Sequence, residues 1–271
     1  MGANELIRGD QVLIKKLQIG GSLTADEIHA LLSAIKPRGQ VPRHSDIVAE
    51  GSTPECCILI MSGFACRYKL LPEGGRQIQA FKIAGDLPDL YGFILGSTDH
   101  AIGALTTCEV AVILHKELQQ ICQTFPNVAR ALWRESLIDG AITREWLTGV
   151  ARRDAYSRTA HLICEQYYRM KAVGLARDGI LEFPVTQAEI ADALGLSTVH
   201  VNRTMKTLSR EKLISYRNHD ITILRWPELQ AAGQFDPAYL HWPDGSSRNT
   251  GSSALRIGHD GFWHLKRIDP R

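Results

Sequence analysis

The sequence contains no apolar run long enough to cross a membrane. Its longest uninterrupted apolar runs cover residues 56–61 and 110–114, whereas a membrane-spanning helix needs about 20 apolar residues. Residues 1–17 also lack the apolar stretch of a secretion signal, because charged side chains interrupt them. We therefore expect a cytoplasmic protein with no membrane partner.

Cysteine is scarce, with six residues in a chain of 271. This number is too small for a disulfide framework, and a reducing cytosol would keep the side chains as thiols. We expect ordinary packing for each of them and keep thiol redox chemistry as the alternative. The candidate redox residues are Cys56, Cys57, Cys66, Cys108, Cys122 and Cys164.

The net charge is small, and it is unevenly distributed along the chain. The formal net charge is +2, yet residues 151–225 carry 12 Lys and Arg against 8 Asp and Glu, a surplus of +4. Residues 1–126 instead carry 11 basic and 13 acidic side chains. The basic surplus favours a polyanion partner for that one segment, although a solvated basic surface is a more frequent cause of such a surplus.

Residues 39–116 have the pattern of a domain made of short strands. Glycine, proline and polar turns separate apolar or alternating segments at 56–61, 64–71, 77–83, 101–105 and 109–114. Many short strands with such turns are typical of a β-sandwich or a jelly-roll barrel. We assign this β-domain to residues 1–126.

After Pro126 the turn residues almost disappear, and the sequence predicts one long helix of about 24 residues, or ~36 Å. Its apolar side chains are mostly four residues apart, at Val128, Leu132, Ile138, Ile142, Trp146 and Val150. So long an apolar stripe needs a partner. That partner is either the β-domain or a second copy of the helix, and the spacing does not choose between them. We assign the segment to residues 127–153.

Residues 186–195 predict a short helix that ends in a tight turn. Thr186 and Glu189 have the spacing of a capping box, so a helix begins there. Gly195 follows the last apolar residue, Leu194, at a position where a left-handed turn favours glycine. Together with the helix predicted next, this is the pattern of a helix–turn–helix.

The second predicted helix begins at Ser197 or Thr198, either of which can cap it, and ends near residue 212. Its inner face would use Val201, Met205 and Leu208. Its outward face presents Thr198, His200, Asn202, Arg203, Lys206 and Arg210. Arg and Asn suit the edges of guanine and adenine, and the later Lys and Arg suit phosphates. We therefore predict a recognition helix for the major groove, the alternative being an exposed basic helix without nucleic acid.

A hairpin at residues 213–224 would be a wing beside this helix. The domain, with a further helix at 156–173, is assigned to residues 154–229. The predicted DNA-binding residues are Thr186, Gln187, Ser197, Thr198, His200, Asn202, Arg203, Lys206, Arg217 and His219. Residues 230–271 are predicted to be a partly disordered tail, because they contain a Gly- and Ser-rich run at 245–253.

Residues 35–229 resemble the CRP/FNR family of bacterial transcription regulators. The matching segments are LIMSG at 59–63, GRQI at 75–78, GDL at 85–87, CEVA at 108–111 and the helix–turn–helix at 186–210. The resemblance implies an α+β chain with an N-terminal jelly-roll β-domain like those that bind cyclic nucleotides. It also implies a long dimerisation helix and a C-terminal winged helix–turn–helix.

As a function, the resemblance implies a homodimer on palindromic promoter DNA that contacts RNA polymerase. The long helix then becomes the dimer interface, through Val128, Leu132, Ile138, Ile142, Trp146 and Val150. The recognition arginine of the family falls on Arg203.

The sequence departs from the members of this family that bind cAMP. Those members hold the phosphate with an Arg-Ser pair, whose positions fall here on Thr98 and Asp99. No Lys or Arg occurs between Lys82 and Lys116, whereas this segment contains Asp86, Asp89, Asp99 and Glu109. A phosphodiester would meet acceptors and like charges there. We expect no binding of cAMP.

An iron–sulfur cluster is not expected either. Oxygen-sensing relatives carry a cysteine cluster near the N-terminus, whereas the first cysteine here is Cys56. Cys56 and Cys57 would point to opposite faces of a strand, and a cluster needs four well-placed thiolates. A haem or small-molecule sensor stays open, with His44, His100 and His115 as candidate ligands, although a single histidine in a β-domain is usually structural.

Two other classes of function are alternatives to a transcription regulator. A cupin-like metalloenzyme fused to a helical domain is disfavoured, because the β-rich segment has no His-x-His and no Gly-x-Ser-x-Gly. We therefore expect no enzyme. A dimeric interaction module that binds no DNA is disfavoured by the polar residues at the start of the second helix, from Thr198 to Arg203.

Overall fold

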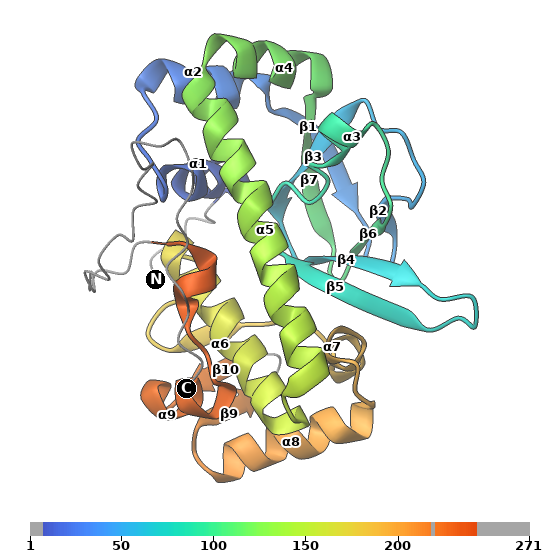
Figure 1. The fold of residues 1–271 in the computed structure, drawn as a ribbon, viewed down its shortest axis with the longest axis vertical. Helices are drawn as coiled ribbons and strands as arrows, with labels where there is room; N and C mark the ends of the chain where they lie inside the picture. Colours follow the sequence, from blue (N-terminus) through green and yellow to red (C-terminus); the bar gives the residue numbers. More distant parts are fainter. Residues whose placement is uncertain (1–7, 218–219, 243–271) are drawn as a thin grey trace, which may run out of the picture.

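The computed structural model describes residues 8–217 and 220–242 as a strand-rich lobe and a helical lobe on either side of one long helix (Figure 1). That helix is α5 (Pro126–Arg152), which passes along the sheets and ends beside the helical lobe (Figure 1). Within the described residues, no helix is both long and apolar enough to span a bilayer.

The strand-rich lobe is made of two antiparallel sheets, with strand orders β1-β7-β3 and β2-β6-β4-β5. Apart from the short helix α3 (Gly92–Leu95), its elements are β1 (Lys36–Val41), β2 (Asp46–Val48), β3 (Cys56–Ser62), β4 (Ala65–Leu70), β5 (Arg76–Lys82), β6 (Ala101–Ala104) and β7 (Cys108–Leu114). Side chains such as Ile58, Ile102 and Val110 fill the space between the sheets. The predicted jelly-roll fold is confirmed.

Strands β1 and β2 were not predicted, because β1 is largely exposed and β2 spans three residues. Such strands carry little of the apolar alternation that marks a half-buried strand.

Three helices that the sequence reading did not identify cover one end of the β-domain. They are α1 (Gly9–Gln18), α2 (Ala25–Ala34) and α4 (His115–Thr124). Thr24 and Glu27 form a complete capping box at the start of α2. The apolar faces of these helices, with Leu13, Leu31 and Leu118, share one core cluster with strands β3 and β7 and the first half of α5.

Helix α5 has 27 residues, so its axis is about 40 Å long. It begins with Pro126, which fits the first helical turn because that turn needs no backbone N–H donor. At its other end, Asp154 caps helix α6 (Ala155–Val173) by accepting a hydrogen bond from the Ser157 backbone N–H at 2.7 Å. The predicted long helix is confirmed; it has 27 residues where about 24 were expected, and it begins and ends one residue earlier than the assigned segment 127–153.

The helical lobe continues with a three-stranded sheet around a pair of short helices. Its elements are β8 (Ile180–Glu182), α7 (Gln187–Leu194), α8 (Thr198–Arg210), β9 (Ile214–Arg217) and β10 (Asp220–Ile223). The sheet order is β8-β10-β9, so the predicted hairpin gains a third strand. This is the predicted winged helix–turn–helix.

The predicted tail begins with folded structure. Helix α9 (Trp226–Gly233) and the 3-10 helix η1 (Pro237–Leu240) pack against α6 and α5. Phe235 and Leu240 are buried there, which explains why residues 230–242 fold although the segment was expected to have little order. Residues 243–271 of the predicted tail lie outside the described residues.

The two lobes share a continuous core. Phe64 and Phe81 of the β-domain meet Phe183, which follows β8, with ring centroids 5.9 and 5.4 Å apart. Outside this core, Arg76 at the start of β5 pairs with Asp192 on α7 at 2.8 Å. The β-domain therefore contacts the helix–turn–helix directly.

Candidate nucleic-acid interface

The local sequence determines where α7 begins and ends. The Thr186 backbone N–H donates to Glu189 Oε2 at 2.7 Å, and the Glu189 N–H donates to Thr186 Oγ1 at 3.2 Å, as the capping box predicts. Gly195 ends the helix in the left-handed region, with φ +61°. Ser197 then caps α8 by accepting from the His200 N–H at 3.3 Å.

Helix α8 has one buried and one exposed face. Val201, Met205 and Leu208 are buried in the core of the helical lobe, together with Ile190 and Leu194 of α7. The opposite face exposes Thr198, Val199, His200, Arg203, Lys206 and Arg210. The structure therefore places five of the six predicted outward residues on one exposed surface, which we call the α8 face.

The sixth residue, Asn202, lies at the edge of this face and contacts another predicted residue. Its Nδ2 donates to Gln187 Oε1 at 2.9 Å, and its side chain is half-buried. Gln187 at the start of α7 therefore orients the amide of Asn202. The predicted pair is brought together, but Asn202 is less free to meet a base than the pattern suggested.

The start of α8 is electropositive. Its first turn contains no acidic residue, and its backbone N–H groups point outward from the helix terminus, where the helix dipole favours an anion. Ser197 Oγ lies 3.0 Å from His200 Nδ1, so the hydroxyl also holds the imidazole. Phosphates beside this end of the helix would meet donors and positive charge.

The wing is partly described. Arg217 ends β9, is exposed, and pairs in register with Asp220 at the start of β10. The predicted contact residue His219 lies outside the described residues. Arg217 is therefore the member of the predicted wing set that the structure places at the turn.

Arg158 holds the helix–turn–helix against the end of α5. Its guanidinium donates to the backbone oxygens of Val150 at 3.1 Å and Arg153 at 2.9 Å, and also to that of Leu194 at the end of α7. Nothing in the sequence pattern indicated a role for Arg158. One side chain thus links the end of α5, the residue that follows it and the end of α7.

The predicted dimer interface on α5 requires correction. Val128, Leu132, Ile138 and Ile142 are 0–5% exposed, because they pack against the chain's own β-domain and α6. Trp146 is half-buried and donates from Nε1 to Glu165 Oε2 at 3.0 Å. Side chains buried in one chain offer no surface to a second, so of this set Val150 alone is exposed, at 41%, and Trp146 is partly covered.

Helix α5 has a second apolar face that the sequence reading missed. Trp133, Leu137 and Leu147 are 69%, 59% and 68% exposed. With Gly140 and Arg144 between them, these positions follow steps of four and three residues, the spacing of a coiled-coil seam. We call the five residues the α5 stripe.

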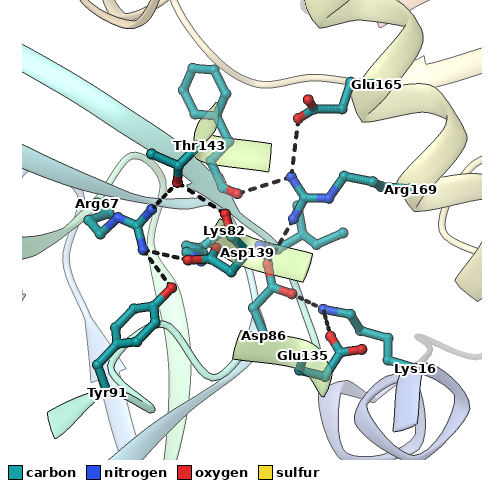
Figure 2. Close-up of polar contacts among 12 residues, drawn as sticks. Lys16, Arg67, Lys82, Asp86, Tyr91, Glu135, Asp139, Thr143, Glu165 and Arg169 are labelled. Atoms are coloured by element: carbon teal, nitrogen blue, oxygen red, sulfur yellow. Dashed lines mark hydrogen bonds and ion pairs between the residues drawn. The ribbon is translucent and has the colours of Figure 1, made fainter. Parts of the chain in front are cut away.

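A network of buried charges lies where α5 crosses the β-domain (Figure 2). Asp139 on α5 accepts from Arg67 of β4 at 2.6 Å and also pairs with Lys82 of β5. Arg67 reaches Thr143 and Tyr91 at 3.0 Å each. Burial alone raises the pKa of Asp139, but the charges of Lys82 and Arg67 hold it well below its usual range.

The network continues into the helical lobe (Figure 2). Asp86 pairs with Lys16 of α1 and lies 3.4 Å from Arg169 of α6. Arg169 also lies 3.6 Å from Glu165, which accepts from the Tyr239 hydroxyl at 2.8 Å. Buried carboxylates thus meet buried cationic side chains from α1, the β-domain and α6, and Glu165 also accepts from a tyrosine hydroxyl in the segment after the wing.

Thr98 and Asp99, which stand where cAMP-binding members have the Arg-Ser pair, contact other residues of the chain. Thr98 is buried and its hydroxyl donates to the Ala49 carbonyl at 3.0 Å. Asp99 is exposed and lies 2.6 Å from His100 Nδ1. A groove of about 530 Å³ runs beside them between the sheet edge and α5, with Arg67, Tyr91, His100 and Leu147 among its lining residues.

Among the residues that the structure describes, the cysteines and histidines gather into no metal-binding cluster. The six thiols are free, and burial raises the pKa of Cys66 to about 12. Burial also raises the pKa of Cys57 and Cys164, and it lowers the pKa of His100 and His115. Across residues 8–217 and 220–242, no group of three or more His, Cys, Asp or Glu side chains could hold a metal ion.

Two protein-family models match the chain in the order of its lobes. A cyclic nucleotide-binding domain matches residues 38–125, and a Crp-like helix–turn–helix domain matches residues 157–232. The second match covers α7, α8 and the wing, the part whose geometry suits DNA.

Curated relatives and solved structures agree with these matches. A "Probable transcriptional activator" of Rhizobium leguminosarum bv. viciae is 31% identical over 67% of this chain and 74% of its own length. The nitrogen fixation regulation protein FixK of Bradyrhizobium diazoefficiens is 30% identical over 64% of this chain and 71% of its own. The structure of FixK2 from Bradyrhizobium japonicum superposes with a TM-score of 0.66 at 24% identity, covering 73% of this chain and 96% of FixK2.

Proposed function

This chain belongs to the CRP/FNR family of transcription regulators and is a DNA-binding regulator, and we propose that it acts as a homodimer on palindromic promoter sites without binding cAMP. The α8 face is the observation that carries the proposal. It gathers Thr198, His200, Arg203 and Lys206 on one exposed helix surface with an electropositive start. This is what a recognition helix needs to enter the major groove.

The α5 stripe supports the homodimer. Trp133, Leu137 and Leu147 present large apolar surfaces to solvent at coiled-coil spacing, and such a surface on a soluble chain marks a site of association. A second α5 that packs along this stripe would cover all three side chains. The same pairing would hold two α8 faces at a fixed separation.

Two recognition helices held in this way suit two half-sites about one DNA turn apart, or roughly 10 base pairs from centre to centre. Arg203 and Lys206 then have different contacts on each half-site. Arg203, near the start of the helix, suits the guanine edge, and Lys206, one turn later, suits a phosphate. By analogy with the family, the promoter-bound dimer would contact RNA polymerase.

Independence from cAMP is supported by the chemistry at the expected phosphate positions. The Thr98 hydroxyl is engaged with the Ala49 carbonyl, and Asp99 brings a carboxylate where the phosphodiester would need donors. The buried guanidinium of Arg67 lines this groove, and Asp139 already neutralises it. We also propose that the chain binds no iron–sulfur cluster. Burial raises the pKa of the Cys57 and Cys66 thiols, and a raised pKa disfavours the thiolate form that ligates iron.

The deciding experiment is selection of bound sites from random duplex DNA with the full chain, followed by sedimentation of the free protein. We expect one palindromic motif with half-sites about one turn apart and a dimer in solution. Calorimetric titration of the same protein with cAMP should show no saturable heat. Binding that ignores sequence, or a monomer at micromolar concentration, would refute the proposal.

A further inference from the structure

A small cavity lies where α5, α6 and α7 meet. Its volume is about 20 Å³, and Gly149, Arg153, Arg158 and Leu194 are among its lining residues. A cavity of this size holds one water-sized sphere and is too small for a phosphate, a sulfate or a carboxylate group. Its occupant is therefore a single water molecule or a monatomic ion.

Two arginine side chains that line this cavity have buried N–H groups without a hydrogen-bond partner. These groups are Nε and Nη1 of Arg153 and Nε of Arg158, from which no described residue accepts a hydrogen bond. The Arg153 side chain is 9% exposed, so bulk water reaches little of it. Leaving buried donors of a charged group unpaired is costly, which indicates a ligand that the described residues do not supply.

The charged side chains around the cavity leave a surplus of positive charge. Glu145 pairs with Arg153, and it is the one carboxylate among the described lining residues. Arg158 instead donates to the backbone oxygens of Val150, Arg153 and Leu194, which carry no net charge. One carboxylate thus faces two guanidinium groups.

Neither of the two other ionisable groups nearby changes this balance. Burial and the charge of Arg153 lower the pKa of His161 to about 4, so the imidazole beside the cavity is neutral at pH 7. Burial lowers the pKa of Arg158, and the charge of Asp154 opposes this shift. The Asp154 carboxylate accepts from the Ser157 backbone N–H at 2.7 Å and is not among the lining residues.

The three unpartnered groups are all donors, which favours an anion over a water molecule. A buried water must also find acceptors for its own hydrogens. A halide ion has no hydrogens to place, and it forms charge-assisted hydrogen bonds with guanidinium N–H groups. It would also neutralise the surplus charge of Arg153 and Arg158.

Gly149 keeps space open beside Arg153. A Cβ at this position would lie 3.4 Å from Arg153 Nη1, which is ordinary van der Waals contact, so alanine would fit and fill part of the space. Gly149 is buried within α5, where alanine is the better helix former. Helix stability therefore does not explain the glycine, whereas room for an occupant beside Arg153 does.

We propose that this cavity is a binding site for one small monovalent anion of the halide class, held by Arg153 and Arg158. The site is separate from the α8 face and from the groove beside Asp99, and it does not depend on the proposed function. Because Arg158 also donates to the backbone at the ends of α5 and α7, the bound anion holds the guanidinium that joins these two helices.

Urea unfolding of the full chain in sodium bromide tests the site. Sodium gluconate at equal ionic strength is the reference, because its anion is too large for the cavity. A ligand that binds the folded state raises the unfolding midpoint until the site is saturated. We expect the midpoint of the natural chain to rise with bromide above the gluconate reference and then to reach a plateau.

Two variants should lose this saturable rise. Gly149→Ala fills space in the cavity and favours the helix, so it should fold as the natural chain does and respond equally to bromide and gluconate. Arg153→Gln removes two of the three donors, and its readout is the loss of the bromide response, whatever its midpoint without bromide. Arg152→Gln removes a neighbouring exposed cation and is the matched control, which should keep the full response.

Anomalous scattering at the bromine absorption edge, from crystals of the full chain grown in sodium bromide, gives the position of the ion. We expect one peak per chain beside Arg153 and Arg158. Equal responses to bromide and gluconate in the natural chain, or a bromide response unchanged in Gly149→Ala, would overturn the proposal. Density for a water molecule at this point in bromide would do the same, and none of these results bears on DNA binding.

Discussion

Asp139 is a single carboxylate that balances two buried cations. It pairs with Arg67 and Lys82, whose side chains are 7% and 6% exposed, and it lies on a different element from both. Removing one partner of a buried ion pair leaves an uncompensated charge, which costs more than the pair itself contributes. The carboxylate therefore helps to hold α5 on the β-domain.

Asp139→Asn should lower the free energy of unfolding by about 3–5 kcal/mol in a urea titration at pH 7. Because the pKa of Asp139 is depressed in the folded state, its contribution is complete above the unfolded value of about 4 and declines as the pH falls below it. The difference between the variant and the natural chain should therefore shrink in acid. Glu73→Gln, at an exposed turn, is the control and should change little. A constant difference from pH 7 to pH 3 would contradict this account.

Arg203 and Lys206 are expected to differ in how their loss affects binding. Arg203→Ala should weaken binding to the selected site by ~1–3 kcal/mol and relax the base preference at one position, as for an arginine on a guanine edge. Lys206→Ala, the matched variant on the same face, should weaken binding to all duplexes and reduce the dependence on salt. Anisotropy titrations with specific and random duplexes at several salt concentrations measure both. Equal losses on the two duplexes for both variants would show that the roles are misassigned.

At the scale of elements, α7 and α8 were predictable because their signals are local. Thr186, Gly195 and Ser197 define the helix ends through contacts within four residues, and the structure shows those contacts. The apolar periodicity of α5 was equally visible, yet it could not assign a partner to each face. Ile138 and Leu137 are neighbours in sequence, but one packs on the chain's own core and the other is exposed.

The long-range contacts of the network could not be predicted from the sequence. Lys16 and Asp86 are 70 residues apart, and Arg67 and Asp139 are 72 residues apart. Nothing in the spacing of such residues indicates that they meet, because their distance depends on how whole elements pack. The same holds for residues 230–242, where composition suggested a tail and packing produced α9 and η1.

Leu147→Glu tests the α5 stripe. A carboxylate in place of this 68% exposed leucine would remove apolar contact and place two like charges at the seam. Sedimentation equilibrium should show a dimer dissociation constant about a hundredfold higher, or ~3 kcal/mol. Leu32→Glu on α2 is the matched control and should leave the dimer unchanged. An unaltered dimer in Leu147→Glu would show that another surface associates.

His161 links α6 to the segment after the wing. Its Nδ1 lies 3.0 Å from the Gly233 carbonyl oxygen, and its ring stacks on Tyr239. Burial, together with the charge of Arg153, lowers the pKa of His161 to about 4, and the nearby Glu145 opposes this shift. The buried imidazole is therefore neutral at pH 7.

Because the folded pKa of His161 lies below the unfolded value of about 6.5, its neutral form stabilises the fold fully above pH 6.5. That stability should fall by roughly 3 kcal/mol as the pH decreases from 6.5 to 4. His161→Gln cannot titrate, so its unfolding free energy should have a shallower slope over this range. Denaturant titrations at half-unit pH steps measure the slopes, and parallel slopes for the two proteins would exclude this role.

At the scale of the whole molecule, the two lobes are joined by one core and by charged contacts around it. Phe64, Phe81 and Phe183 form a single aromatic cluster across the junction, and Arg76 reaches Asp192 outside it. Neither lobe can lose its structure without exposing part of the other's core. The chain should therefore unfold as one unit, although the sequence suggests separate domains.

Scanning calorimetry should show one transition at pH 7, with a calorimetric enthalpy equal to the van't Hoff enthalpy of the cooperative unit. Phe183→Ala should lower the transition temperature and separate the lobes into two transitions, because Phe183 contacts aromatic rings of the β-domain. Two resolved transitions in the natural chain would refute the shared core as a source of cooperativity.

Because the chain is synthesised from its N-terminus, residues 226–242 are the last described segment to join the fold. A ribosome delivers the β-domain, α5 and α6 before it delivers Tyr239, whose hydroxyl donates to the fully buried Glu165 carboxylate. While residues 226–242 are still inside the ribosome, Glu165 lacks the hydrogen bond from Tyr239. Arg134 likewise lacks the hydrogen bond that it donates to the His241 carbonyl oxygen. The contacts that this segment makes with α5 and α6 can thus form only after translation has passed the wing.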